Sequence, residues 1–144
     1  MKISSKGRYA LRAMTDLALH NTGECIRTRD IAQRQNISEK YLEQIVTVLS
    51  KSGLIRSVRG AQGGYLLKKD PGNYTVGEIL GAVEGELDPM PDGEAEDESL
   101  IAASERDLVY EKLRKAIGGV LYGVTLADLV KDHSQRLASF DYVI

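Results

Sequence analysis

Apolar positions near the start of the chain recur every third or fourth residue, which is the spacing of a helix with one buried face. The pattern predicts a helix at about residues 6–21, with Ser4 or Ser5 as its cap. The buried stripe of this helix consists of Ala10, Ala13, Met14, Leu17 and Ala18. The helices that follow are expected to pack on this stripe.

Two further helices are expected next, separated by a tight turn. The first begins at Thr28, which we interpret as its cap, and ends at a turn around Asn36. The second opens at Ser38 and runs to Gly53, because glycine accepts the left-handed conformation that ends many helices. Two helices joined by so short a turn are typical of a helix-turn-helix.

After the second of these helices the pattern changes to two short strands, LIRSV at residues 54–58 and GYLL at 64–67. The glycine-rich segment RGAQGG joins them as a hairpin. Helix, turn, helix and two-stranded wing, in this order, indicate a winged helix-turn-helix. The sequence therefore predicts a mainly α fold with a small β-wing, in which a DNA-binding domain over residues 1–84 contains the motif at 28–51 and the wing at 54–67.

The helix that opens at Ser38 has one apolar and one polar side. At about 100° per residue, one side collects Leu42, Ile45, Val46 and Leu49. The opposite side carries Lys40, Gln44, Thr47 and Lys51, with Tyr41 and Glu43 on its flanks. Cations, amides, hydroxyls and carboxylates are the groups that contact base edges in the major groove. An ordinary solvated helix face is the alternative, but Arg56 and Arg59 on the following wing favour DNA binding.

The second half of the chain contains another capped helix, an acidic loop and a long helix. The capping box Thr75-Val76-Gly77-Glu78 starts a helix that runs to about residue 83. An acidic loop follows at residues 85–98, and a long helix is expected from about 99 to 118. Its apolar stripe consists of Val109, Leu113, Ala116, Ile117 and Val120. We expect this stripe to pair with a second copy in a homodimer, and packing within one protomer is the alternative.

The last residues are expected to form a short helix and a tail. Thr125 caps the helix, which has the sequence LADLVKD, and the tail from Ala138 to Ile144 is apolar and aromatic. The alternative is a tail docked on its own domain. Residues 99–144 are thus interpreted as a dimerisation helix and a C-terminal tail.

Charge is divided unevenly between the two halves of the chain. Residues 1–69 hold 13 Lys/Arg and 5 Asp/Glu, whereas residues 70–144 hold 6 Lys/Arg and 16 Asp/Glu. A basic half attracts phosphate and an acidic half does not. Lys6 and Arg8, near the start of the first helix, are candidates for phosphate contacts, and solubility alone is their other interpretation.

Candidate chemistry outside DNA binding is sparse. Cys25 is the single cysteine, and it is either a small buried hydrophobic residue or a redox-sensitive thiol on a loop beside Arg27. The two histidines lack metal-ligand spacing, and no nucleophile–base pair is visible, so an enzyme is the least favoured class. No apolar run is long enough to span a bilayer and no signal segment is visible, so a cytoplasmic protein with no membrane association is expected.

Three segments resemble the Rrf-type winged-helix repressors, and the likeness extends over nearly the whole chain. They are MKISSKGRYALRAM, SEKYLEQIVTVLSKSGLIRSVRGAQGGYLL, and the later TVGEIL with VEG. The resemblance implies a homodimer joined by a long C-terminal helix. It also implies that the recognition helix is Ser38–Lys51, that Tyr41, Glu43 and Gln44 contact bases, and that Arg59 enters the minor groove.

Many members of this family hold an iron–sulfur cluster on three cysteines before the dimer helix. The corresponding segment here has no cysteine, so no iron–sulfur cluster or other cofactor is expected. The sequence is most similar to the cluster-free branch that represses cysteine metabolism. That likeness implies cysteine synthase as a protein partner, which could bind Tyr142, Val143 and the C-terminal carboxylate of Ile144. The alternative function is a protein-interaction subunit that chiefly binds and restrains cysteine synthase.

Overall fold

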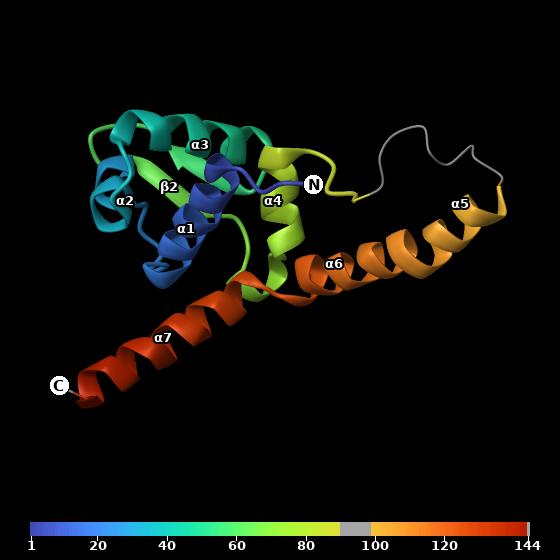
Figure 1. Cartoon of the computed structure of the whole chain (residues 1–144). Coiled ribbons are helices and arrows are strands. Elements are labelled where there is room, and N and C mark those ends of the chain that lie inside the picture. Colours follow the sequence, from blue (N-terminus) through green and yellow to red (C-terminus); the bar gives the residue numbers. More distant parts are fainter. Residues whose placement is uncertain (90–98, 144) are drawn as a thin grey trace.

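The computed structural model describes residues 1–89 and 99–143, with side chains up to residue 140. In chain order its elements are α1 (Ser5–Leu19), α2 (Thr28–Gln35), α3 (Glu39–Lys51), β1 (Ile55–Val58), β2 (Gly64–Leu67), a 3-10 turn (Pro71–Asn73), α4 (Val76–Glu84), α5 (Leu100–Glu105), a π-helical stretch (Arg106–Tyr110), α6 (Glu111–Gly123) and α7 (Leu126–Val143). The strands form one antiparallel pair. The expected mainly α fold with a small β-wing is confirmed (Figure 1).

The core lies between α1, α3 and the base of the wing. The expected inner face of α3 is buried throughout, and it consists of Leu42, Ile45, Val46 and Leu49. The expected α1 stripe is buried against it in the same cluster. Each buried Leu or Ile side chain contributes ~1.5–3 kcal/mol. The side chain of Ser38 caps α3 by accepting a hydrogen bond from the backbone N–H of Tyr41 at 3.1 Å. These contacts fix the orientation of α3.

The expected turn around Asn36 is confirmed, and the expected cap at Thr28 is wrong. Asn36 has φ 54°, the left-handed conformation that lets the chain reverse between α2 and α3. Thr28 is the first residue of α2, and the capping position belongs to Arg27, which makes no side-chain capping bond. The reason is a backbone pairing outside the helix, because Ile26 exchanges hydrogen bonds of 2.9 and 2.8 Å with Tyr65 of β2. The helix therefore begins at Thr28, one residue earlier than it would if Thr28 were the cap.

An ion pair between a buried carboxylate and a partly exposed arginine holds α2 against α1. The carboxylate of Asp16, 1% exposed, accepts hydrogen bonds from two nitrogens of Arg34 at 2.8 and 2.9 Å. The side-chain amide of Gln35 donates a third, at 2.9 Å. The hydrogen bonds with Asp16 raise the pKa of the Arg34 guanidinium above its ordinary value. A bidentate arginine–carboxylate pair constrains both the distance and the angle between the two side chains, so it fixes the position of α2 relative to α1.

The C-terminal helices are longer than the sequence analysis expects. The helix expected to end near residue 118 continues to Gly123, and Leu121 is buried beside Val76 and Leu80 of α4. The expected short helix and separate tail are one helix, α7, which extends to Val143. Residues 126–143 contain no glycine or proline to stop it.

The expected start of α7 is confirmed. The Oγ1 of Thr125 accepts a hydrogen bond from the backbone N–H of Asp128 at 3.1 Å, and the Asp128 carboxylate accepts one from the backbone N–H of Thr125 at 2.9 Å. Leu126 is fully buried in the core, whereas residues 131–140 are exposed. The first turns of α7 are thus part of the globular body formed by α1–α4 and the strands, and the rest extends beyond it.

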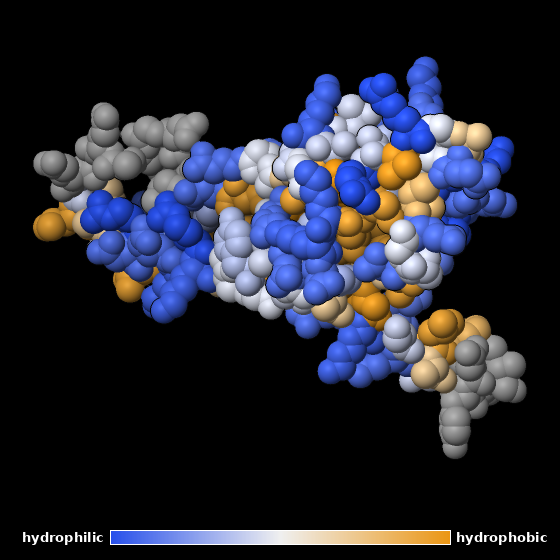
Figure 2. All heavy atoms as spheres, turned by 180° about the vertical axis from the view of Figure 1, so that it is seen from behind, coloured by the Kyte–Doolittle hydropathy of each residue, from blue (hydrophilic) through white to orange (hydrophobic). Residues whose placement is uncertain are grey.

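Two helical arms project from the body in different directions. In Figure 1, α5 and α6 extend to one side and α7 extends to the other. Figure 2 shows apolar surface on the body and also on both arms. The exposed large apolar residues of the arms are Leu100, Ile101, Leu108, Val109, Leu113, Val120, Tyr122, Leu137 and Phe140. Apolar surface on projecting helices is typical of an interface with another chain.

Candidate nucleic-acid interface

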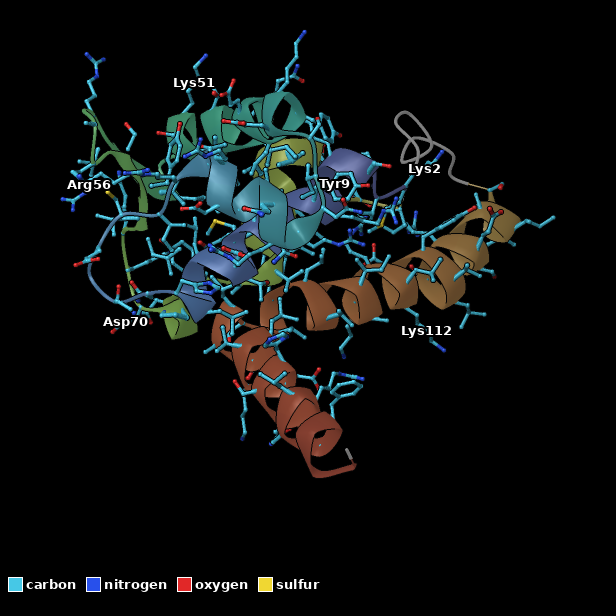
Figure 3. The ribbon with its side chains drawn as sticks, turned by 90° about the vertical axis from the view of Figure 1, so that its left-hand side faces the viewer. Lys2, Tyr9, Lys51, Arg56, Asp70 and Lys112 are labelled. Atoms are coloured by element: carbon cyan, nitrogen blue, oxygen red, sulfur yellow. The ribbon has the colours of Figure 1, made fainter. Side chains whose placement is uncertain are left out.

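The outer face of α3 presents its polar side chains to solvent. These residues are Lys40, Glu43, Gln44, Thr47 and Lys51, all of them exposed. Figure 3 shows the side chain of Lys51 pointing away from the body. The hydroxyl of Thr47 donates to the backbone carbonyl of Glu43 at 2.7 Å, so toward a ligand it offers an acceptor. This face can enter a major groove with donors and acceptors available for base edges.

Tyr41 differs from its neighbours because its ring is half-buried at the start of α3. It packs edge-on against Tyr9 of α1, with ring centroids 5.7 Å apart and planes at 86°. The guanidinium of Arg12 lies 5.1 Å from the centroid of the Tyr9 ring. The resemblance implied that Tyr41 contacts a base, and the packing adds a second role for it, since the ring braces the first turn of α3. Tyr9 was not singled out from the sequence, because helical periodicity says nothing about its neighbour 32 residues later.

The wing lies next to α3 in the chain and carries the two arginines that were expected to bind DNA. Arg56 lies on β1 and Arg59 follows β1, and both are exposed. Two glycines let the hairpin close. A Cβ atom at Gly63 would overlap the carbonyl oxygen of Val58, and one at Gly64 would overlap that of Ile26. Only glycine fits these two positions without a shift of the backbone.

The loop before α2 supports the far end of the wing. The thiol of Cys25 donates to the carbonyl of Gln62 at 2.8 Å, and the guanidinium of Arg27 donates to the carbonyl of Ala61 at 3.3 Å. Cys25 is half-buried at this place. The loop before α2 therefore contacts the hairpin that carries Arg59 through two side chains.

Tyr74 fastens the base of the wing. Its side chain is fully buried, and its hydroxyl donates to the carbonyl of Leu54 at 2.6 Å, just before β1. The same oxygen accepts hydrogen bonds from the backbone N–H groups of Lys68 at 2.9 Å and Lys69 at 3.3 Å, just after β2. One hydroxyl thus joins both ends of the hairpin. Tyr74 was also missed in the sequence, because its partners come from two other segments.

Replacing Tyr74 by phenylalanine is expected to lower the free energy of unfolding by about 2 kcal/mol, because three backbone groups at the base of the wing lose a hydrogen-bond partner. Urea denaturation monitored by circular dichroism measures the change. The matched control is Tyr122→Phe, a hydroxyl removed from an exposed ring, with an expected change within about 0.5 kcal/mol. Equal stability of the two variants would contradict this role for the Tyr74 hydroxyl.

The start of α1 is tied to the end of α4. The carboxylate of Glu84 accepts hydrogen bonds from the backbone N–H of Ser4 at 2.8 Å and from its hydroxyl at 2.6 Å. Ser4 in turn caps α1, which settles the choice between Ser4 and Ser5. Lys6 is half-buried in the first turn, and exposed Arg8 donates to the Ser5 hydroxyl at 3.1 Å. Arg8 also lines a groove along α1, so its side chain borders other protein residues as well as solvent.

The expected dimer stripe is largely uncovered by its own protomer. The exposed fractions are 46% for Val109, 44% for Leu113 and 61% for Val120, and Ala116 is exposed as well. Ile117 is half-buried and packs beside α4. Most of the stripe therefore remains available for another chain.

The residues expected to bind cysteine synthase lie at the end of α7. Tyr142 and Val143 belong to its last turn, but their side chains and all of Ile144 lie outside the described residues. Within the described part of the chain, no group of three or more His, Cys, Asp or Glu residues has metal-site geometry. No helix in that part is both long and apolar enough to cross a bilayer.

The helix-turn-helix, the exposed polar face of α3 and the adjacent wing define a winged-helix DNA-binding protein. A model of the Rrf2 family, described as "Iron-dependent Transcriptional regulator", matches residues 3–132. The chain belongs to the Rrf2 family of transcription regulators, as the resemblance in the sequence indicated. Its relatives are named as regulators of transcription and not as enzymes.

Three similar proteins illustrate the relationship. The transcriptional regulator IscR of Klebsiella pneumoniae is 41% identical over 137 residues, which cover 92% of this chain and 81% of that protein. The structure of CymR, the global cysteine regulator of B. subtilis, is 40% identical, with a TM-score of 0.80 over 91% of this chain and 97% of that one. An oxidized form of Staphylococcus aureus CymR is 39% identical, with a TM-score of 0.70 over 90% of this chain and 96% of that one.

Proposed function

We propose that this protein is a homodimeric repressor that binds operators of cysteine or sulfur metabolism genes. The observation that carries the proposal is the exposed polar face of α3 beside a wing with two exposed arginines. In this mechanism the basic half anchors phosphates, the outer face of α3 contacts base edges in the major groove, and Arg59 enters the minor groove. Such a protein acts in the cytoplasm.

In this proposal the N-terminal and C-terminal parts of the chain have different roles. Residues 1–84 bind DNA and residues 99–144 hold two copies together, with the acidic segment 85–98 between them. A twofold dimer places its two recognition helices roughly 34 Å apart, the spacing of successive major grooves on one side of the duplex. The exposed apolar stripe that continues along α6 supports this arrangement. A helix that faced only solvent would be expected to carry polar and charged residues at these positions.

A gel-shift titration at several salt concentrations tests the proposal. Specific binding that weakens steeply with salt is expected, because each neutralised phosphate releases counterions. Absence of binding at low salt, with or without cysteine synthase, would instead favour an interaction subunit that chiefly restrains cysteine synthase. That second candidate takes its support from α7, whose outer half exposes Leu137 and Phe140.

The link to cysteine metabolism is supported by similarity to the cysteine regulator of B. subtilis. In this proposal, cysteine synthase binds the end of α7 and the C-terminal carboxylate, in the general mode of C-terminal capture. Deleting Val143 and Ile144 is expected to abolish binding to cysteine synthase, which isothermal titration calorimetry measures. Unchanged affinity of the truncated protein would remove this partner site.

We propose that the protein works without an iron–sulfur cluster, although its family is described as iron-dependent. Such clusters are held chiefly by cysteine thiolates, and this chain has a single cysteine. That cysteine is hydrogen-bonded to a wing carbonyl. The donor set does not fit a cluster, so the signal must enter by another route.

Oxidation of Cys25 is a second candidate for signal input, and the oxidized form of the S. aureus relative supports it. A sulfenic acid or an intermolecular disulfide at Cys25 would change its contact with Gln62 and shift the wing. Peroxide is therefore expected to weaken operator binding by the wild type and to leave Cys25→Ser unaffected. Fluorescence anisotropy before and after peroxide measures both. An equal response of the two proteins would exclude Cys25 as the sensor.

A further inference from the structure

The tyrosine pair between α1 and α3 lies on the flank of α3 and not on its buried stripe. At about 100° per residue, Tyr41 projects roughly 100° away from Leu42, which lies at the centre of that stripe. The half-buried ring of Tyr41 meets the ring of Tyr9 edge-on, with the centroids 5.7 Å apart (Figure 3). A contact on the flank of a helix acts at a distance from the helix axis, so it resists rotation of the helix about that axis.

The buried stripe of α3 resists such a rotation less well. It consists of four aliphatic side chains, Leu42, Ile45, Val46 and Leu49. Their burial is non-directional, because it depends on the apolar area removed from water. The tyrosine pair, with planes at 86°, is directional, because the positive edge of one ring faces the negative face of the other. The stripe therefore fixes how deeply α3 is buried, and the tyrosine pair fixes its rotation.

A third side chain holds the ring of Tyr9. Arg12 follows Tyr9 by three residues on α1, so the two side chains lie on the same face of that helix. The guanidinium of Arg12 lies 5.1 Å from the centroid of the Tyr9 ring, within the range of a cation–π interaction. Arg12 is exposed, so the interaction is weak, yet it favours one orientation of the ring. Arg12, Tyr9 and Tyr41 thus form a chain of contacts from the surface of α1 to the start of α3.

The rotation of α3 about its axis decides where its polar side chains lie. Glu43 and Gln44 are exposed and follow Tyr41 within one turn of the helix. Their outer atoms lie about 6 Å from the axis, so a rotation of about 10° moves them by about 1 Å. Hydrogen bonds to base edges need donor–acceptor distances of about 2.7–3.2 Å. A small rotation therefore disrupts base contacts, whereas a flexible lysine side chain can still reach a phosphate.

We propose that Tyr9 is a positioning residue for base recognition, which acts through Tyr41 to set the rotation of α3. Tyr9 then determines sequence preference without a base contact of its own, and Arg12 supports it from the surface of α1. The inference deepens the proposed function and rests on it, because it requires that the outer face of α3 contacts bases. A phosphate contact by the Tyr9 hydroxyl is a different role, since it would raise affinity for every duplex equally.

Two substitutions of Tyr9 in the full-length protein separate these roles. Tyr9→Leu keeps an apolar side chain and removes the aromatic contact, whereas Tyr9→Phe keeps the ring and removes only the hydroxyl. Fluorescence anisotropy at two salt concentrations measures affinity for the preferred operator and for an unrelated duplex. The ratio of these two affinities is the specificity ratio. Partial unfolding lowers both affinities equally, so the specificity ratio reports the positioning of α3 and not the stability of the protein.

Tyr9→Leu is expected to lower the specificity ratio about 10-fold, and Tyr9→Phe is expected to restore it. Arg12→Ala should lower the ratio about 2-fold, and Arg12→Lys should restore it, because lysine keeps a cation over the ring. In a Glu43→Ala background, Tyr9→Leu should lower the ratio by a smaller factor than in the wild type. The reason is that the base contact that Tyr9 positions is already missing there.

An unchanged specificity ratio for Tyr9→Leu would overturn the positioning role while leaving DNA binding intact. Uniform loss of affinity for Tyr9→Phe, with a smaller salt dependence, would instead assign Tyr9 to phosphate binding. If circular dichroism shows that Tyr9→Leu does not fold, the exposed Arg12 variants decide by the same ratio. A wild-type protein without preference among duplexes would remove the proposed function, and the positioning role with it.

Discussion

Replacing Leu113 by glutamate is expected to produce a folded monomer whose affinity for a two-half-site operator is about 100-fold lower or weaker still. Leu113 lies within the α6 stripe and is 44% exposed in the protomer, so the protomer tolerates a polar side chain there. In the proposed dimer the same position would be covered, and a buried unpaired carboxylate costs several kcal/mol. A monomer contacts only one half-site, so the gain in affinity from binding both half-sites at once is lost.

Sedimentation velocity measures the oligomeric state of Leu113→Glu, and fluorescence anisotropy measures its operator affinity. Lys115→Glu is the matched control, because it places the same carboxylate two residues away on the opposite side of α6. The control is expected to remain a dimer. A Leu113→Glu protein that stays dimeric with wild-type affinity would show that the stripe is not the interface.

The second large effect concerns the outer face of α3 and the wing, which we propose contact the DNA. Replacing Arg59 by alanine is expected to weaken binding about 10-fold or more on every duplex and to reduce the salt dependence by about one phosphate contact. Replacing Glu43 by alanine is expected to act differently. It should relax the preference for one base pair, with a discrimination loss of about 1–3 kcal/mol, and leave nonspecific affinity nearly unchanged.

Competition binding against single-base operator variants separates the two effects. Arg136→Ala is the control for loss of a cation, because Arg136 is exposed on α7, far along the arm from the wing. It should bind like the wild type. If Arg59→Ala and Glu43→Ala both keep wild-type affinity and the same preferred site, the assignment of the DNA contacts to α3 and the wing is wrong.

The features that the sequence made predictable are those decided within a few residues. The inner face of α3 follows from helical spacing, and its start follows from a serine that can reach the N–H three residues later. The positive φ at Asn36 follows from the tolerance of asparagine for that conformation. Local preference and final structure agree at these positions, since nothing distant competes with them.

The features that were missed depend on partners far away in the chain. The start of α2 is set by the pairing of Ile26 with Tyr65, which overrides the capping preference of Thr28. The roles of Tyr9 and Tyr74 depend on contacts with α3 and the wing. The length of α7 was underestimated because its last residues, apolar and aromatic from Ala138 onward, were interpreted as a separate tail. Residue spacing within one segment carries no signal for such contacts.

Selection of bound duplexes from a random pool by the wild-type protein tests the central proposal most directly. If the outer faces of two α3 helices and their wings contact DNA as a twofold pair, the selected sequences should share an inverted repeat. Its half-site centres should lie about 10 base pairs apart, or a multiple of that distance. Recovery of no shared sequence, or of a single unpaired half-site, would contradict the account.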